Sequence, residues 1–203
     1  MEELRISERP ALRRPVLVAA FRGWNDGGQG ATLAAGHLAQ AWDATRFAEI
    51  DPEGFFDFQA TRPHVSLVDG LSRRIDWPEN AFYYAPRPDA ERDVVLLIGI
   101  EPNLRWRTFT TLIVDLAREL GVDMLITLGS LLADVPHTRP SPVTGAGRVC
   151  GTSASSAPSV TTSSTPSSRA KSVITVANVR QRRFGSIPSS RTASRSSPSG
   201  RAW

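Results

Sequence analysis

The sequence predicts an α/β fold, in which parallel strands form a central sheet with helices on its faces. Three observations support this prediction. An apolar segment, Pro15–Phe21, precedes a Gly-rich turn and an Ala-rich helical pattern. A continuous apolar run, Asp93–Ile100, precedes a second helical pattern, and a further apolar segment, Val122–Leu128, follows that pattern. Strand, helix and strand in this order form a βαβ unit, which nearly always crosses over right-handed and pairs parallel.

The first strand and helix are predicted from small and branched residues. Pro15–Phe21 has the composition of a strand that is buried on both faces. Gly23–Gly30 forms a turn into a helix over about Gln29–Ala41, with Asn25 or Asp26 as a candidate cap. The apolar face of this helix is predicted to comprise Ala31, Ala34, Leu38 and Ala41.

The middle of the chain predicts shorter strands. Phe47–Ile50 and Phe82–Ala85 are two of them. Val65–Val68 and Arg73–Trp77 form a hairpin through Asp69-Gly70, a sequence typical of tight turns. Between these strands the aromatic residues Phe55, Phe56 and Phe58 are expected to build a core or a subunit interface.

The βαβ unit is the clearest prediction. Asp93–Ile100 is a strand buried on both faces, and Gly121 stands where a helix C-cap belongs. Between these two positions a helix is predicted, because apolar residues repeat at helical spacing: Phe109, Leu112, Ile113, Leu116, Ala117 and Leu120. Val122–Leu128 is the next strand, and Gly129 is expected to end it and begin a polar loop that contains Ser130.

Charge divides the chain into two parts. Residues 1–134 hold all 20 acidic residues and 14 arginines, a net charge of −6, whereas residues 135–203 hold ten basic residues and no acid. The first part is mildly acidic and therefore gives no reason to expect nucleic acid. Arginine outnumbers lysine 23 to one, which suggests a GC-rich coding sequence.

The composition also changes near Arg148. Residues 151–203 contain 16 serines, no leucine and no acid, and Val173–Val179 is the one strand-like segment, without an apparent partner. Such a composition buries too little apolar surface to offset chain entropy. We therefore expect an α/β domain over residues 1–147, incomplete at its C-terminus, and a Ser/Arg-rich disordered tail over residues 148–203.

Two accounts of this tail compete: a native basic tail that could touch nucleic acid, and out-of-frame translation of GC-rich DNA. We favour the second, because the change falls within the predicted sheet. An incomplete sheet would leave an apolar strand edge exposed, which predicts a poorly soluble product.

Other features exclude several classes of protein. The single cysteine, Cys150, excludes a disulfide framework and a cysteine metal cluster. The three histidines are too scattered for a metal site, and we expect no metal or other cofactor. No apolar run is long enough to span a membrane, and the charged N-terminus lacks the features of a signal peptide. We therefore expect a cytoplasmic protein.

Three loops should meet where the parallel strands end, because carboxyl ends of parallel strands share one edge of a sheet. Their polar side chains are the candidate binding residues: Arg22, Asn25, Asp26, Glu101, Asn103, Arg105, Ser130, Asp134, His137 and Arg139.

Each loop has a functional and a structural interpretation. The first could cradle a phosphate, although GWNDGGQG matches neither nucleotide-binding pattern and favours a capped turn. In the second, Arg105 and Arg107 stand at the start of the helix, where an arginine could hold an anion or pair with Glu101 on the surface. In the third, Asp134 and His137 could serve Ser130 as a nucleophile, but no GxSxG surrounds this serine. A rigid, proline-braced loop is the favoured interpretation, and no catalytic residue is assigned.

Several separated motifs in order carry a family resemblance. PVLVAAF followed by GWNDGG, IDPEGFFDFQATRP, GIEPNLRWRTF and TLGSLLADVPHTRPSPVTG resembles the proteasome assembly chaperone 2-like family, in the form common in actinobacteria. The similarity runs from about Pro15 to Gly147. It implies a three-layer α/β fold similar to phosphorylase/hydrolase-like proteins, and homo-oligomers. Eukaryotic members of the family assist assembly of proteasome α-rings and archaeal members bind proteasome subunits, whereas bacterial members have no firmly assigned activity.

The resemblance implies a non-catalytic, chaperone-like binding protein whose partners include copies of itself and proteasome subunits. The alternative is a phosphorylase- or hydrolase-type enzyme that acts on a small anionic or nucleoside-like ligand. In that case Arg22, Arg105 and Arg139 would hold the anion, and His137 or Asp134 would transfer protons.

Overall fold

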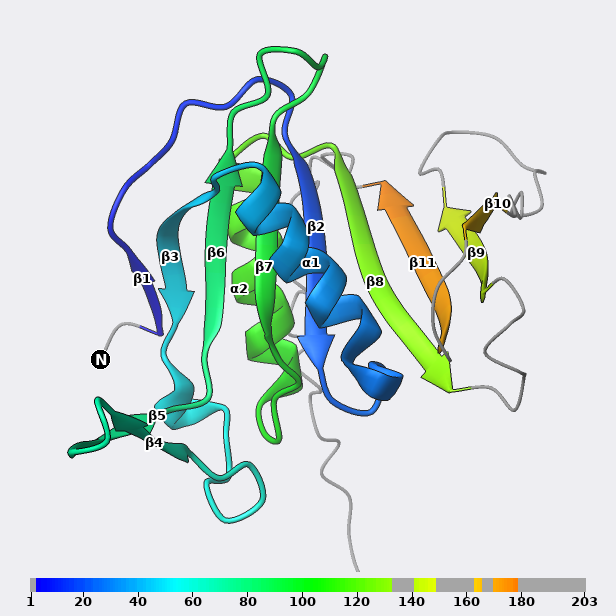
Figure 1. The fold of residues 1–203 in the computed structure, drawn as a ribbon. Helices are drawn as coiled ribbons and strands as arrows, with labels where there is room; N and C mark the ends of the chain where they lie inside the picture. Colours follow the sequence, from blue (N-terminus) through cyan, green and yellow to red (C-terminus); the bar gives the residue numbers. More distant parts are fainter. Residues whose placement is uncertain (1–2, 133–140, 149–162, 166–169, 179–203) are drawn as a thin grey trace, which may run out of the picture.

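The computed structural model of the chain describes residues 3–132, 141–148, 163–165 and 170–178, which form a mixed sheet with one helix on each face (Figure 1). The strand order is β1-β3-β6-β7-β2-β8-β11-β9-β10. Helix α1 lies in front of the sheet in the view of Figure 1 and α2 lies behind it. The predicted three-layer α/β architecture is confirmed.

The elements have the following bounds. The strands of the large sheet are β1 (Leu4–Ile6), β2 (Val16–Arg22), β3 (Thr45–Ile50), β6 (Asn80–Ala85), β7 (Val94–Ile100), β8 (Met124–Leu132), β9 (Ser141–Arg148), β10 (Ser163–Thr165) and β11 (Ala170–Asn178). The helices are α1 (Gly30–Ala41) and α2 (Trp106–Glu119), with 3₁₀ turns η1 (Gly27–Gln29) and η2 (Pro52–Gly54). A separate hairpin comprises β4 (His64–Val68) and β5 (Ser72–Asp76).

The centre of the sheet is parallel, as predicted. Strand β2 lies between β7 and β8 and pairs parallel with both. The unit β7–α2–β8 therefore crosses over β2 on the face opposite to α1. Strands β6 and β3 continue the sheet antiparallel beyond β7. This combination places the carboxyl ends of β2, β7 and β8 at one edge, which is the lower edge in Figure 1.

Alternating side chains of the central strands fill two cores. Leu17 and Ala19 of β2 pack in the core that contains α2, whereas Val16 and Val18 pack in the core next to α1. The α2 side is the larger core and contains most of the buried phenylalanines, among them Phe55, whose ring centroid lies 5.5 Å from that of Phe109. Burial of such a side chain contributes about 2 to 3 kcal/mol, so these aromatic contacts fix α2 and the segment around Phe55.

The helix and hairpin predictions are confirmed in outline. Asp69 and Gly70 both have positive φ, and Leu71 N–H donates to the carbonyl of Val68, which closes the tight turn expected of this pair. Gly121 ends α2 with φ +73°. The buried face of α1 differs from the prediction, because Ala35 is buried and Ala34 is exposed.

Two strand predictions were wrong. Strand β8 does not stop at Gly129 but continues through Ser130 to Leu132. Glycine is needed there because the segment that contains Asn25 packs on it: a Cβ at Gly129 would lie 2.8 Å from Asn25 Nδ2. The segment Val173–Val179 does have a partner, because β11 pairs antiparallel with β8 and parallel with β9. Strand β8 is therefore not the exposed edge that the sequence suggested.

Within the described part of the chain, neither helix has the length and apolar character that a transmembrane helix requires.

Candidate functional site

The crevice between the carboxyl ends of β2 and β7 is where an α/β sheet of this kind would hold a ligand. After β2 the chain turns to α1 on the front face, and after β7 it turns to α2 on the back face (Figure 1). Neighbouring strands whose connections leave to opposite faces create a topological switch point, and ligands of open α/β sheets bind there. Two of the three predicted loops border this crevice: Arg22–Gln29, called loop one, and Glu101–Arg105, called loop two.

A side chain of the protein itself fills the crevice. The backbone N–H of Trp24 donates to Glu101 Oε2 and that of Asn25 donates to Glu101 Oε1, both at 3.1 Å. Gly23 allows this approach, because a Cβ there would lie 2.6 Å from the Glu101 carboxyl carbon. Loop one is therefore an anion cradle, as its glycines suggested, but the anion it holds is a carboxylate of loop two.

A second carboxylate joins loop one to β8 and α1. Asp26 is 5% exposed and Ser130 is 1% exposed. The Ser130 hydroxyl lies 2.7 Å from Asp26 Oδ1 and 2.8 Å from the carbonyl oxygen of Gly27. Asp26 also accepts the N–H groups of Ala31 and Thr32 and the Thr32 hydroxyl. Asp26 thus performs the capping that the sequence assigned to Asn25 or Asp26, from a position before the helix.

These contacts keep Asp26 ionised. Burial alone would raise the pKa of its carboxyl group, but the hydrogen bonds from Thr32 and Ser130, together with two backbone N–H groups, outweigh burial and lower that pKa below the ordinary value. A buried carboxylate with all these donors has little capacity left for a ligand. It also makes Ser130 a poor nucleophile, since the hydroxyl is enclosed and the carboxylate that accepts its hydrogen bond has a lowered pKa and is therefore a weak base.

The other polar residues of loop two hold the segment that contains η2. Asn103 Oδ1 accepts the backbone N–H of Asp57 at 3.0 Å and the Thr61 hydroxyl at 2.9 Å. The Arg105 guanidinium pairs with Glu3 at 2.5 Å and lies 5.2 Å from the ring centroid of Phe55. Asn103 and Arg105 therefore tie distant segments together, and the predicted Glu101–Arg105 pair is replaced by two separate contacts.

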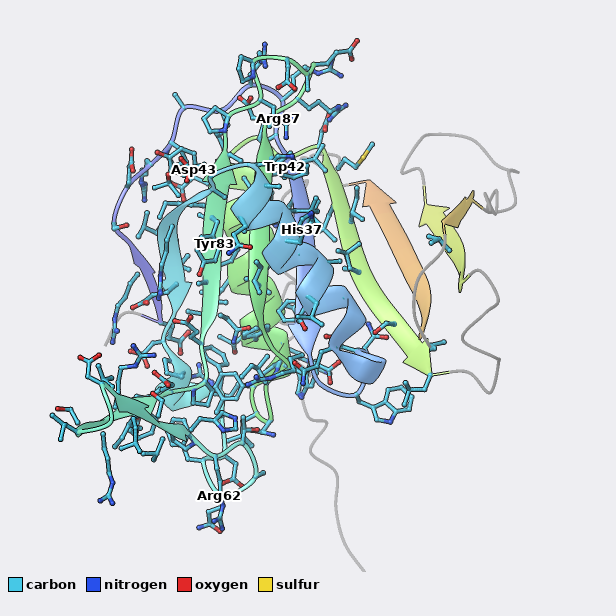
Figure 2. The ribbon with its side chains drawn as sticks, viewed as in Figure 1. His37, Trp42, Asp43, Arg62, Tyr83 and Arg87 are labelled. Carbon is cyan, nitrogen blue, oxygen red and sulfur yellow. The ribbon has the colours of Figure 1, made fainter. Side chains whose placement is uncertain are left out.

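Arg22 borders a cleft beside the crevice. The cleft has a volume of about 440 Å³, and its walls include Gln29 and Thr32 near the start of α1, Trp77 before β6, and Tyr83 on β6. A shallower hollow of about 700 Å³ continues along α1 past His37 and Asp43 and shares Tyr83 with the cleft (Figure 2). Burial, followed by the carboxylate of Glu79, raises the pKa of Tyr83 and keeps its hydroxyl protonated.

Among residues 3–132, the hydroxyl groups of Ser130 and Ser66 donate to the carboxylates of Asp26 and Asp76, and hydrogen bonds lower the pKa of both carboxyl groups, which makes them weak bases. His37 and His64 are both exposed. The described ranges also contain no group of three or more His, Cys, Asp or Glu side chains placed to hold a metal ion. Asp134, His137 and Arg139 of the third predicted loop lie outside the described residues.

Large apolar side chains are exposed at the same end of the sheet as the crevice, and the sequence interpretation did not recognise them as a group. We call this region the apolar end. Its members are Trp24, Leu33, Val65, Leu67, Val68, Leu71, Ile75, Trp77, Leu104, Trp106, Leu131 and Leu132, which are all of the exposed large hydrophobic residues in the described part of the chain. They come from loop one, the first turn of α1, the β4–β5 hairpin and the residue that follows it, loop two and the start of α2, and the end of β8. The available signal was their position, since Trp24, Leu71 and Leu104 stand in turns, where apolar side chains are seldom buried.

Comparisons with known proteins agree with this architecture. The model of the PAC2 family matches residues 20–183. A PAC2 family protein from Streptomyces avermitilis is 46% identical with a TM-score of 0.57, and the match covers 64% of this chain and 57% of that one. A Mycobacterium tuberculosis proteasome-assembly chaperone homologue is 34% identical with a TM-score of 0.60, covering 80% and 74% of the two chains.

A more distant match shares the fold alone. Pyrococcus furiosus PbaB, an archaeal proteasome activator, is 24% identical with a TM-score of 0.54 over 70% of this chain and 56% of that one. The comparison with curated proteins gave no match.

Proposed function

The chain belongs to the PAC2 family, and from this premise we propose that it is a non-catalytic, chaperone-like protein of the cytoplasm that binds proteasome subunits. The similarity to the Mycobacterium tuberculosis proteasome-assembly chaperone homologue supports the choice of partner. We also propose that copies of the chain associate into a homo-oligomer.

One observation carries the non-catalytic part of the proposal: Glu101 occupies the position where an α/β enzyme would bind an anionic substrate. Both N–H groups that Trp24 and Asn25 direct at the crevice already have a carboxylate partner. A phosphate or substrate carboxylate would have to displace Glu101 and leave its charge beside the incoming anion. This like-charge contact is unfavourable in a partly buried site, so the crevice favours internal structure over catalysis.

The cleft beside Arg22 supports the alternative, an enzyme of the phosphorylase or hydrolase type. Its size suits a small molecule, and Arg22 together with the aromatic side chains Trp77 and Tyr83 could hold an anionic, nucleoside-like ligand. This alternative predicts phosphate-dependent cleavage of nucleosides. It also predicts that Arg22→Ala abolishes cleavage while the thermal unfolding midpoint stays close to that of the wild type.

The leading proposal is tested by affinity capture of purified proteasome α-subunits on the full chain. We expect α-subunits to be retained and an unrelated protein of similar charge, presented at the same concentration, to pass through. Sedimentation velocity of the chain alone then measures its oligomeric state. Absence of α-subunit binding at micromolar concentrations would refute the chaperone function, and nucleoside cleavage that depends on Arg22 would replace it with the enzymatic one.

A further inference from the structure

We propose that the cleft beside Arg22 binds a small organic anion that carries a planar ring. A chaperone-like role assigns no small molecule to the chain, so this ligand goes beyond the proposed function. Its binding requires neither proteasome subunits nor the nucleoside cleavage of the enzymatic alternative. The shape of the cleft, the charge of its walls and their apolar side chains together identify this class of ligand.

The cleft separates the start of α1 from the base of the β4–β5 hairpin. One wall contains Arg22 and residues of α1, and the other contains the hairpin base and the segment that leads into β6. Residues 98–100, at the end of β7, lie between the walls. Because β7 separates β2 from β6, these two strands stand roughly 10 Å apart, which is two strand spacings. This span and the volume of about 440 Å³ admit a fused ring with one charged substituent.

The charged side chains of the walls favour an anion. Both carboxylates of the walls have an arginine partner that lies outside the cleft: Asp76 pairs with Arg74 at 2.6 Å, and Glu79 pairs with Arg46 at 3.1 Å. Arg22, in contrast, makes no ion pair with another described residue. Its guanidinium group is therefore available to a ligand that brings its own negative charge.

The unpaired carboxylates at this end of the sheet lie outside the walls. Glu53, Asp57 and Asp69 make no ion pair with another described residue, but none of them lines the cleft. Glu101 does not line it either, and both of its oxygens accept N–H groups of loop one. Arg62 lines the cleft, but its side chain extends outward from the molecule (Figure 2), so Arg22 is the principal anchor.

Apolar side chains share the walls with Arg22. Leu33 in the first turn of α1 is 66% exposed, and Trp77 on the opposite wall is about half-exposed. The ring of Phe58 meets that of Trp77 edge to face, with centroids 4.9 Å apart, and so holds the indole in place. An ordered, accessible indole is a surface on which a planar ring can stack. Charge on one wall and an aromatic ring on the other therefore select a ligand that has both features.

Isothermal titration calorimetry of the full chain with 1-naphthyl phosphate and 1-naphthoate tests the ligand class. We expect at least one of these anions to bind with a Kd below about 1 mM, and the tighter of the two identifies the acidic group. Inorganic phosphate, which lacks the ring, should bind at least tenfold more weakly. So should 1-naphthylmethylammonium, which carries the same ring and the opposite charge.

Two pairs of matched variants test the place of binding. Arg22→Gln removes the anchoring charge, and Leu33→Glu puts a carboxylate into the wall. The controls are Arg73→Gln and Leu67→Glu, because Arg73 is an exposed arginine without an ion pair to a described residue, Leu67 is 64% exposed, and neither lines the cleft. We expect both cleft variants to weaken binding of the tighter anion at least tenfold and both controls to stay within twofold of the wild type.

Equal losses in cleft variants and controls would overturn the proposal, and so would wild-type binding by both cleft variants. Absence of binding by either aromatic anion, or equal binding of 1-naphthylmethylammonium, would refute the ligand class. Thermal unfolding of each variant shows that it is folded, and Leu33→Glu decides the question if Arg22→Gln is not. Capture of α-subunits requires no small molecule, so failure of the cleft proposal leaves the proposed function standing, and failure of capture leaves the cleft proposal standing.

Discussion

The two ends of the sheet use similar internal contacts but present different surfaces. At the amino end of β7, Asp93 accepts the backbone N–H groups of Arg13 at 2.6 Å and Arg87 at 2.8 Å. At the carboxyl end, Glu101 accepts two N–H groups of loop one in the same manner. Around Asp93, at what we call the polar end, the exposed side chains include ion pairs such as Arg87 with Asp89, whereas the end that holds Glu101 also exposes large apolar side chains such as Trp24 and Leu104.

The exposed apolar side chains at the carboxyl end do not result from a poorly ordered backbone. A poorly formed region could expose apolar side chains because nothing packs on it, but loop one is fixed by hydrogen bonds to Glu101, to Ser130 and to the start of α1. The backbone of loop one is therefore held in place by hydrogen bonds, and the exposed residues of this loop lie on an ordered surface. Selective exposure on an ordered surface is what a binding function requires.

Among the polar residues at the two ends of the sheet, the largest effect on stability is expected from Asp26→Ala. This change removes the acceptor of the Ser130 and Thr32 hydroxyl groups and of two backbone N–H groups of α1, all within a nearly inaccessible site. Loss of several buried hydrogen bonds should lower the free energy of unfolding by about 3 kcal/mol. Urea denaturation measures this loss. Asp89→Ala at the polar end is the control, and an equally large loss there would contradict the distinction between the two ends.

The pH dependence of stability should follow the carboxylates that anchor each end. Burial alone would raise the pKa values of Asp26 and Asp93, but hydrogen bonds from side chains and backbone lower both. A pKa that is lower in the folded state contributes stability above the ordinary carboxyl pKa of 3.8, and this contribution disappears as the pH falls through the folded pKa. The stability difference between wild type and Asp26→Asn should therefore be constant from neutral pH to about pH 5 and shrink below about pH 4.

Urea denaturation of wild type, Asp26→Asn and Asp93→Asn over this pH range measures both contributions. A difference that grows on acidification would contradict the direction assigned to these pKa values.

The central sheet could be predicted from the sequence because its signals are local. Strands β2 and β7 are continuous apolar runs, and α2 repeats its apolar residues at helical spacing, so each element identifies itself within a few residues. The strands beyond β8 could not be predicted in the same way. Strand β11 pairs with β8, which lies some forty residues earlier in the chain, and the residues of neither segment predict this pairing.

The candidate site could be predicted in position but not in role. The polar residues after β2 and β7 do meet, as the shared edge of parallel strands requires. Their partners depend on geometry that spacing does not contain: Glu101 reaches loop one rather than Arg105, and Ser130 reaches Asp26 from within a strand. Asp134, His137 and Arg139 remain predictions. So does the boundary at residue 148, which sequencing of the gene around codon 148 would test.

A smaller effect is expected when the anion cradle is emptied. Glu101→Ala leaves the N–H groups of Trp24 and Asn25 without their partner and should lower the free energy of unfolding by about 1 to 2 kcal/mol. Because the cradle itself remains, acetate should raise the thermal unfolding midpoint of this variant and not that of the wild type. Glu101→Gln, which retains one acceptor oxygen, should lose less stability and respond less to acetate. Equal responses of variant and wild type would show that loop one does not select a carboxylate.

The smallest effect on stability is expected from the apolar end itself. Trp24→Ser and Leu71→Ser replace side chains that are almost fully exposed, so the free energy of unfolding should change by less than about 0.5 kcal/mol. Urea denaturation of each variant measures this change. Phe55→Ser is the contrasting variant, because Phe55 is fully buried against Phe109, and its loss should exceed 3 kcal/mol. If Trp24→Ser destabilised the chain as strongly as Phe55→Ser, Trp24 would belong to the core and not to the exposed surface.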